Sequence, residues 1–274
     1  MKSLTEKLAD LPWYTEGPVV DQGGNLFFTT LTGGKIMTLT AGIPSVWGES
    51  LCPNGQFIAV NGEHWVCDSR QGSVAVYSRD GSFIRNLVEK KCAGRDFTTP
   101  NDLIADSAGN LYFSESIRNN GKVFFIGTDG KEELVADGID YANGLILSHD
   151  ESILYVAESY GNRILALTLD QKRLVRNRQV LIQLPEHPSG DPLKNLPDGL
   201  GIDREGRIWV AHYGMGMLQV IAPEGELITS VETHLPLTSN LTFIEDTPGK
   251  KVLLVTGGYG EPGPGAVMKV TVYT

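Results

Sequence analysis

The stretch PNDLIADSAGNLYFSESIRNNGKVFFI, residues 100–126, contains three short apolar runs separated by two glycine-containing turns. The first run ends at Asp106, the second is rich in aromatic residues, and the third begins after Gly121. Short apolar runs bounded by turn residues are typical of β-strands, and glycine turns between them are typical of hairpins. Residues 100–126 therefore predict consecutive antiparallel strands.

The same order of runs and turns recurs six times along the chain. The aromatic-rich runs are NLFFT from Asn25, HWVCD from His64, NLYFS from Asn110, ILYVA from Ile153, RIWVA from Arg207 and VLLVT from Val252. Equivalent positions in these runs lie 38 to 54 residues apart: Leu26, His64, Leu111, Leu154, Ile208 and Leu253. Their mean separation of about 45 residues matches the length of one propeller blade.

We therefore predict an all-β chain folded as a single six-bladed β-propeller over residues 1–274. Helical periodicity is nearly absent after the first ten residues, and 32 of the 274 residues are glycine, which fits many tight turns. A pair of β-sandwiches is the alternative architecture. We favour the propeller because sandwiches do not usually repeat one unit six times.

Composition excludes several classes of partner. The chain has 23 Lys and Arg against 33 Asp and Glu, so its formal charge of −10 opposes nucleic acids and anionic membranes. No apolar run approaches the roughly 18 residues of a membrane span. Three cysteines and an N-terminal MKSLTEKLAD without the apolar core of a secretory signal favour a cytoplasmic location. We expect a small molecule as the partner.

Oxygen-bearing side chains precede the aromatic-rich runs at a nearly constant spacing. The gap is ten residues for Glu16, Asn54, Asn101 and Asp198, eleven for Asn143 and thirteen for Asn240. Because the chain enters the innermost strand of each blade here, we expect these side chains to ring the mouth of the central channel. For Asn54 and Asn240 we favour a turn-capping role. Oxygen ligands without Cys or His suit Ca²⁺ or Mg²⁺, and amides mixed with two carboxylates suit Ca²⁺ best.

Four of these positions lie in motifs that resemble the senescence-marker-protein/gluconolactonase family: EGP from Glu16, PND around Asn101, ANG around Asn143 and PDG around Asp198. The resemblance implies a six-bladed propeller with one divalent cation on the channel axis, and lactone hydrolysis as the activity. That cation is most commonly Ca²⁺, with Mg²⁺, Mn²⁺ or Zn²⁺ as alternatives. The resemblance makes Glu16, Asn143 and Asp198 its ligands and places Asn101 beside it, in contact with substrate or with a metal-bound water.

Thr99 and His212 complete the predicted substrate contacts. Thr99 lies two residues before Asn101, where family members that hydrolyse sugar lactones usually carry Arg, so we expect a less hydroxylated substrate. His212 follows the strand after Asp198 and is a candidate substrate donor or proton shuttle. The ends of the other aromatic-rich strands, at Asp68, Glu115 and Glu158, lie on the same side of their blades and are weaker candidates.

These residues predict a metal-dependent hydrolase that opens a lactone or related cyclic ester. The cation would polarise the carbonyl group, and Asp198 would be either the general base or only a ligand. Two alternatives are hydrolysis of phosphotriesters at the same site and a non-catalytic propeller that binds a ligand or protein. The second is disfavoured because Glu16 facing Asp198 would be two unpaired buried charges without a cation.

Overall fold

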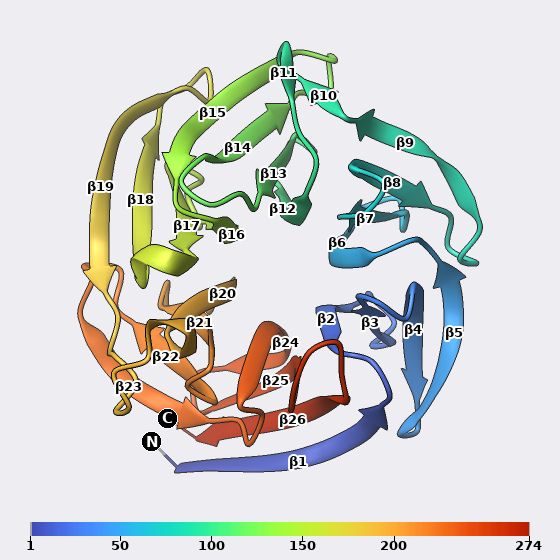
Figure 1. Ribbon diagram of the computed structural model, residues 1–274, viewed down its shortest axis with the longest axis vertical. Coiled ribbons are helices and arrows are strands. Elements are labelled where there is room, and N and C mark those ends of the chain that lie inside the picture. The colour runs from blue at the N-terminus through green and yellow to red at the C-terminus, as the bar shows by residue number, and fades with distance from the viewer. Residues whose placement is uncertain (1, 274) are drawn as a thin grey trace.

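The strands of the computed structural model, which describes residues 2–273, form six sheets in a ring around a central channel (Figure 1). No α-helix occurs within these residues, and two short 3₁₀ helices, η1 (Ser159–Gly161) and η2 (Pro192–Lys194), lie between strands. Six radially arranged sheets make a six-bladed β-propeller, which confirms the predicted fold class. The described residues include no helix long and apolar enough to cross a membrane.

In the first five blades the strands follow one another in sequence from the channel to the rim. Blade 1 contains β2 (Thr15–Val20), β3 (Leu26–Thr30), β4 (Lys35–Thr40) and β5 (Ile43–Glu49). Blade 2 contains β6 (Pro53–Ile58), β7 (His64–Asp68), β8 (Ser73–Tyr77), β9 (Phe83–Glu89), β10 (Lys91–Cys92) and β11 (Arg95–Asp96). Blade 3 contains β12 (Pro100–Ala105), β13 (Leu111–Glu115), β14 (Gly121–Ile126) and β15 (Glu132–Ile139). Blade 4 contains β16 (Ala142–Leu147), β17 (Ile153–Glu158), β18 (Arg163–Leu169) and β19 (Val175–Gln183). Blade 5 contains β20 (Leu196–Ile202), β21 (Ile208–Tyr213), β22 (Met217–Ile221) and β23 (Leu227–Glu232).

The sixth blade combines both ends of the chain. Its strands are β24 (Leu237–Thr247), β25 (Lys250–Gly258), β26 (Gly265–Tyr273) and, at the outer edge, β1 (Lys2–Leu11). β1 runs antiparallel to β26, from Lys2 opposite Tyr273 to Leu11 opposite Gly265. The first strand therefore closes the ring and covers the outer edge of β26. The repeat pattern does not predict this strand, because it lies outside the six repeated units.

An aspartate sets the turn between the first and second strands of several blades. Asp106 Oδ1 accepts hydrogen bonds from the backbone N–H groups of Ala108 and Asn110, at 3.0 and 2.9 Å. Asp21 and Asp203 make the same pair of bonds in blades 1 and 5. A carboxylate that bonds the chain two and four residues ahead stabilises a tight turn. This explains why the first run of the repeat ends in Asp.

The hydrophobic core lies between neighbouring blades. Tyr112 of β13 and Leu154 of β17 are fully buried in one cluster that joins blades 3 and 4. Trp209 of β21 and Leu253 of β25 are likewise buried in a cluster that joins blades 5 and 6. Each second strand is largely buried on both faces, so it contains several consecutive apolar residues. These buried second strands are the aromatic-rich runs of the repeat.

The inner strands approach one another closely around the channel. In β16 a bulge between Ala142 and Leu145 leaves Asn143 and Gly144 outside the regular ladder. A Cβ atom on Gly144 would lie only 2.3 Å from the carbonyl oxygen of Asp198 in the next inner strand. Glycine at this position therefore lets the two strands meet near the axis. The bulge and the glycine together place Asn143 beside Asp198.

Candidate active site

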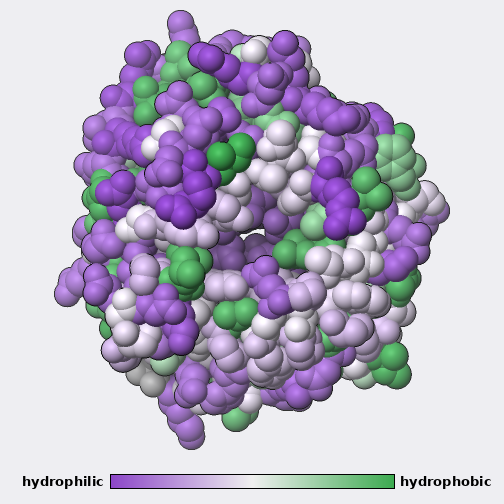
Figure 2. Space-filling model, viewed as in Figure 1, coloured by the Kyte–Doolittle hydropathy of each residue, from purple (hydrophilic) through white to green (hydrophobic). Residues whose placement is uncertain are grey.

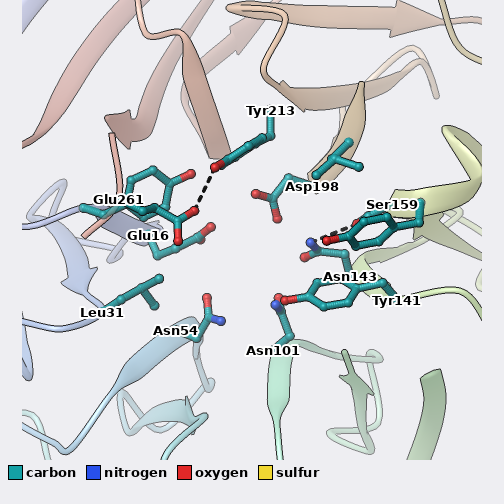
Figure 3. Close-up of a pocket in the computed structure, with 13 residues that line it drawn as sticks. Glu16, Leu31, Asn54, Asn101, Tyr141, Asn143, Ser159, Asp198, Tyr213 and Glu261 are labelled. Carbon is teal, nitrogen blue, oxygen red and sulfur yellow. Dashed lines mark hydrogen bonds between the residues drawn. The ribbon is translucent and has the colours of Figure 1, made fainter. Parts of the chain in front are cut away.

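A cavity of about 310 Å³ occupies the mouth of the channel. It appears as a hollow with hydrophilic residues inside it at the centre of the face in Figure 2. Its wall includes the three predicted metal ligands Glu16, Asn143 and Asp198, and also Asn101 and Asn54 (Figure 3). The fold thus brings together side chains from the inner strands of five consecutive blades, as the spacing in the sequence predicts.

The sixth position of this ring is not filled by Asn240. The bulge of β24 lies at Ser239, between Thr238 and Asn240, so Ser239 is the residue equivalent to Asn143. Ser239 donates a hydrogen bond to the carbonyl oxygen of Thr15 at 2.9 Å, and Asn240 donates one to Glu16 Oε2 at 3.3 Å. The sequence alignment was wrong by one residue here, because a second bulge and a longer hairpin lengthen this blade.

In blades 2 to 4 the loop that enters the inner strand is held by a carboxylate at the end of the second strand. Glu115 Oε1 accepts a hydrogen bond from the N–H of Thr98 at 2.8 Å, and Glu158 Oε1 accepts one from Asp140 at 2.9 Å. Asp68 holds the corresponding loop of blade 2 in the same way. The residue that donates each bond lies three residues before the site asparagine of its blade. These carboxylates position the site residues and are not part of the cavity wall.

The serine after each of these carboxylates joins one blade to the next. Ser159 Oγ donates a hydrogen bond to the carbonyl oxygen of Pro197 at 2.8 Å and accepts one from Asn143 Nδ2 at 3.2 Å (Figure 3). Ser69 makes the corresponding pair of bonds in blade 2, where Asn54 Nδ2 is the donor at 3.3 Å. Because the amide nitrogens are used in this way, the amide oxygens of Asn143 and Asn54 are left for the cavity.

The cavity wall fits a divalent cation. Asn143 Oδ1 is buried and has no hydrogen-bond partner. Burial raises the pKa of Glu16 to about 8, and burial together with the charge of Glu16 raises the pKa of Asp198 well above its usual range. Within residues 2–273 no three His, Cys, Asp or Glu side chains meet as a metal-binding group, so the site depends on amide oxygens as well. A cation such as Ca²⁺ would bind the unpartnered oxygen and balance both carboxylates.

Without a cation, the stability of the fold should fall as the pH rises from about 5 to about 8. The Glu16 carboxyl has a higher pKa in the folded chain than in the unfolded chain, so the folded state binds more protons in this range. Thermal unfolding of chelator-treated protein across this range measures the effect. Glu16→Gln should flatten the profile, and a metal-free protein whose stability rises over this range would contradict the expectation.

His212 does not contact the cavity, so the structure does not support its predicted role in substrate binding. Its ring is fully buried, with Nδ1 accepting from Gln219 Nε2 at 3.2 Å and Nε2 donating to Asn162 Oδ1 at 3.0 Å. Ser230 donates to Gln219 Oε1, which fixes the orientation of that amide and hence the tautomer of His212. Burial lowers the pKa of His212 to about 4, so the ring is neutral.

His212→Ala should therefore lower the free energy of unfolding by about 2–4 kcal/mol, because it opens a cavity and leaves two buried amides unpaired. In the remaining folded protein, kcat/KM for the lactone hydrolysis predicted from the sequence should stay within about twofold of wild type, since no substrate contact is lost. Chemical denaturation and steady-state kinetics on the same preparation separate the two effects. A large loss of kcat/KM in fully folded protein would restore the catalytic interpretation.

Thr99 is also outside the cavity wall. Its hydroxyl donates a hydrogen bond to the carbonyl oxygen of Ser116 at 3.1 Å, so the predicted substrate contact is not supported. Nearby Arg118 is held by Asp140, 2.8 Å from its Nε, and stacks on Tyr160, 3.6 Å from the ring centre. Among the described residues, the side chains that line the cavity therefore include no arginine.

The sequence analysis missed the residues at the outer rim of the cavity. Four tyrosines (Tyr14, Tyr141, Tyr160 and Tyr213) and Glu261 line it. Tyr160 follows the dipeptide Glu158–Ser159, which recurs as Asp68–Ser69 and Glu115–Ser116, so this repeat was an available signal for Tyr160. Tyr213 occupies the position equivalent to Ser159, after His212. Glu261 lies in the loop between β25 and β26, which has no counterpart in the repeat.

The fold and this cavity define a six-bladed propeller with a cavity lined by carboxylate and amide oxygens at one end of its channel. Residues 14–258 match the SMP-30/gluconolactonase/LRE-like region, and the chain belongs to this family. The family resemblance drawn from the EGP, PND, ANG and PDG motifs is therefore confirmed.

Sequence relatives and solved structures agree with this assignment. The chain is 30% identical over 254 residues to a gluconolactonase from Zymomonas mobilis, covering 80% of this chain and 69% of that protein. It is 25% identical over 275 residues to lactonase drp35 from Staphylococcus aureus, covering 92% and 81%. A gluconolactonase structure from Xanthomonas campestris superposes with a TM-score of 0.82 at 24% identity, covering 98% and 89%. A calcium-binding regucalcin from Agrobacterium tumefaciens superposes with a TM-score of 0.78 at 18% identity, covering 97% and 92%.

Proposed function

We propose that this protein is a divalent-cation-dependent hydrolase that opens a lactone or related cyclic ester, with Ca²⁺ as the cation. The observation that carries the proposal is the pair of buried carboxylates, Glu16 and Asp198, in one cavity with the unpartnered oxygen of Asn143. Relatives named gluconolactonase and lactonase support the substrate class. The relative named as calcium-binding supports the choice of cation.

Glu16, Asn143 and Asp198 would hold the cation. When bound, it would supply the Lewis acidity that polarises the lactone carbonyl and stabilises negative charge on its oxygen. Asn101 lies beside these ligands on the cavity wall and would donate a hydrogen bond from its amide to the substrate. The rim tyrosines would enclose the lactone ring and exclude bulk water from the reacting carbonyl.

Asp198 would act as the general base. One carboxylate oxygen would accept a proton from water as the water oxygen bonds to the carbonyl carbon. The ring C–O bond then breaks, and the proton held by Asp198 passes to the departing alkoxide oxygen. The product is the open hydroxy acid, so water is consumed and no other reactant is needed.

A panel of compounds tests the proposal. Purified protein with added Ca²⁺ is assayed for acid release from aliphatic and aromatic lactones, glucono-1,5-lactone and a phosphotriester. We expect hydrolysis of at least one lactone. Turnover of the phosphotriester alone would favour the alternative hydrolase, and binding without turnover would favour a non-catalytic propeller. Glu224→Gln is the control for variants of the cavity carboxylates, because Glu224 is an exposed residue in the turn between β22 and β23.

A further inference from the structure

We propose that Glu261 makes this cavity a charge-selective site, which prefers lactones that carry a cationic group and discriminates against anionic ones. The inference rests on the proposed function and specifies its substrate class. It follows from the charge balance of the cavity wall, from the way Glu261 is held, and from the tyrosine rings around it.

The charges of the cavity wall do not cancel. Among the described residues that line the cavity are three carboxylates, Glu16, Asp198 and Glu261, and no Lys, Arg or His. A divalent cation would balance Glu16 and Asp198, which leaves Glu261 as the surplus negative charge. The guanidinium of Arg118 stacks on the rim residue Tyr160, and it is already paired with Asp140. A carboxylate or phosphate on the substrate would therefore meet repulsion without a counter-charge.

Glu261 is held in place by a departure from the repeat. In blades 2 to 4 the residue after the loop-holding carboxylate is a serine. Its hydroxyl donates a hydrogen bond to the backbone carbonyl oxygen of the residue just before the site residue of the next blade, as Ser116 does to Ala142 before Asn143. Blade 5 has Tyr213 at this position, after His212. The Tyr213 hydroxyl instead donates a hydrogen bond to Glu261 Oε1 at 3.0 Å (Figure 3). The longer side chain thus fixes a carboxylate at the cavity rim.

Aromatic rings line the same cavity as this carboxylate. Tyr14 and Tyr213 form one edge-to-face pair with ring centres 6.4 Å apart, and Tyr141 and Tyr160 form another at 5.5 Å. All four residues line the cavity together with Glu261. The faces of aromatic rings attract cations, and quaternary ammonium groups in particular are bound in cages of aromatic rings. The rim is therefore suited to an ammonium substituent on the substrate.

Three lactones of one ring size test the inference. One carries a trimethylammonium group, whose charge does not depend on pH, the second a tert-butyl group of the same shape, and the third a carboxylate. Because Glu261 is exposed, we expect Glu261→Gln to lower the ratio of kcat/KM between the ammonium and tert-butyl lactones by about three- to fivefold. Glu261→Lys should reverse the preference and raise the ratio of the carboxylate to the tert-butyl lactone by about tenfold.

Two controls separate a charge effect from a damaged loop. Glu224→Gln removes an equal charge at the end of blade 5 that is far from the cavity. It should leave the ratios of kcat/KM among the three lactones unchanged. Moderate salt should shrink the difference between wild type and Glu261→Gln, because exposed charges are screened over about 8–10 Å. Tyr213→Phe keeps the charge of Glu261 but removes the hydrogen bond that holds its carboxylate. Its ratio of kcat/KM between the ammonium and tert-butyl lactones should therefore lie between those of wild type and Glu261→Gln.

The outcomes distinguish this inference from the proposed function. Lactone hydrolysis with ratios that do not change in Glu261→Gln and Glu261→Lys would overturn the inference and leave the proposed function intact. If wild type hydrolyses none of the three lactones, the proposed function fails for them, and calorimetric binding of the ammonium lactone then decides. Equal dissociation constants for wild type and Glu261→Lys would overturn charge selection as well.

Discussion

Asp198→Asn should lower kcat/KM for lactone hydrolysis by roughly 10²–10⁴, which is the contribution of a positioned general base. The amide has nearly the same shape as the carboxylate and keeps one oxygen toward the cavity, so measurable cation affinity should remain. It cannot accept a proton from water. Steady-state kinetics at saturating Ca²⁺, with cation binding measured by calorimetry on the same protein, give the two quantities separately.

Glu16→Gln is the matched comparison, because Glu16 lines the same cavity and is also buried. This change should act mainly by weakening the binding of the cation, so that excess Ca²⁺ restores much of the rate. The difference in rescue between the two variants separates base from ligand. If added Ca²⁺ returned Asp198→Asn to nearly the wild-type rate, Asp198 would be a ligand only.

Removal of the cation should lower the melting temperature by about 5 °C or more. A ligand that binds only the folded state at a hundredfold excess over Kd contributes about 2.7 kcal/mol, and a chain of this size shifts by a few degrees for each kcal/mol. The loss also leaves Glu16 and Asp198 facing each other without a counter-charge. Thermal unfolding with chelator, and then with Ca²⁺ restored, measures the shift. Identical melting in both conditions would argue against a cation at this position.

The blades and most of the ring of oxygens could be predicted from sequence because both follow from repetition. Buried second strands such as residues 111–115 contain several consecutive apolar residues, so they recur as recognisable runs. Glu16, Asn54, Asn101, Asn143 and Asp198 sit at the same bulge of successive inner strands, so their spacing is nearly constant. A constant spacing in the sequence therefore predicts that these side chains lie together in the folded chain.

The failures occurred where local geometry departs from the repeat. An additional bulge in β24 places Asn240 one residue away from the ring position. The spacing of residues along the sequence does not reveal a bulge. His212 occupies a position equivalent to Glu115 and Glu158, which hold loops behind the cavity, so its place on the strand did not imply access to substrate. Glu261 lies in a loop between strands, where neither periodicity nor spacing constrains the side chain.

Titration of metal-stripped protein with Ca²⁺ while lactone hydrolysis is followed tests the central claim most directly. The account predicts no hydrolysis above background without cation, and a rate that rises with each addition of Ca²⁺ until one ion is bound per chain. Asp198→Asn should bind the ion with little gain in rate. Lactone hydrolysis that proceeds at its full rate in metal-stripped protein, or none at any Ca²⁺ concentration, would contradict the account.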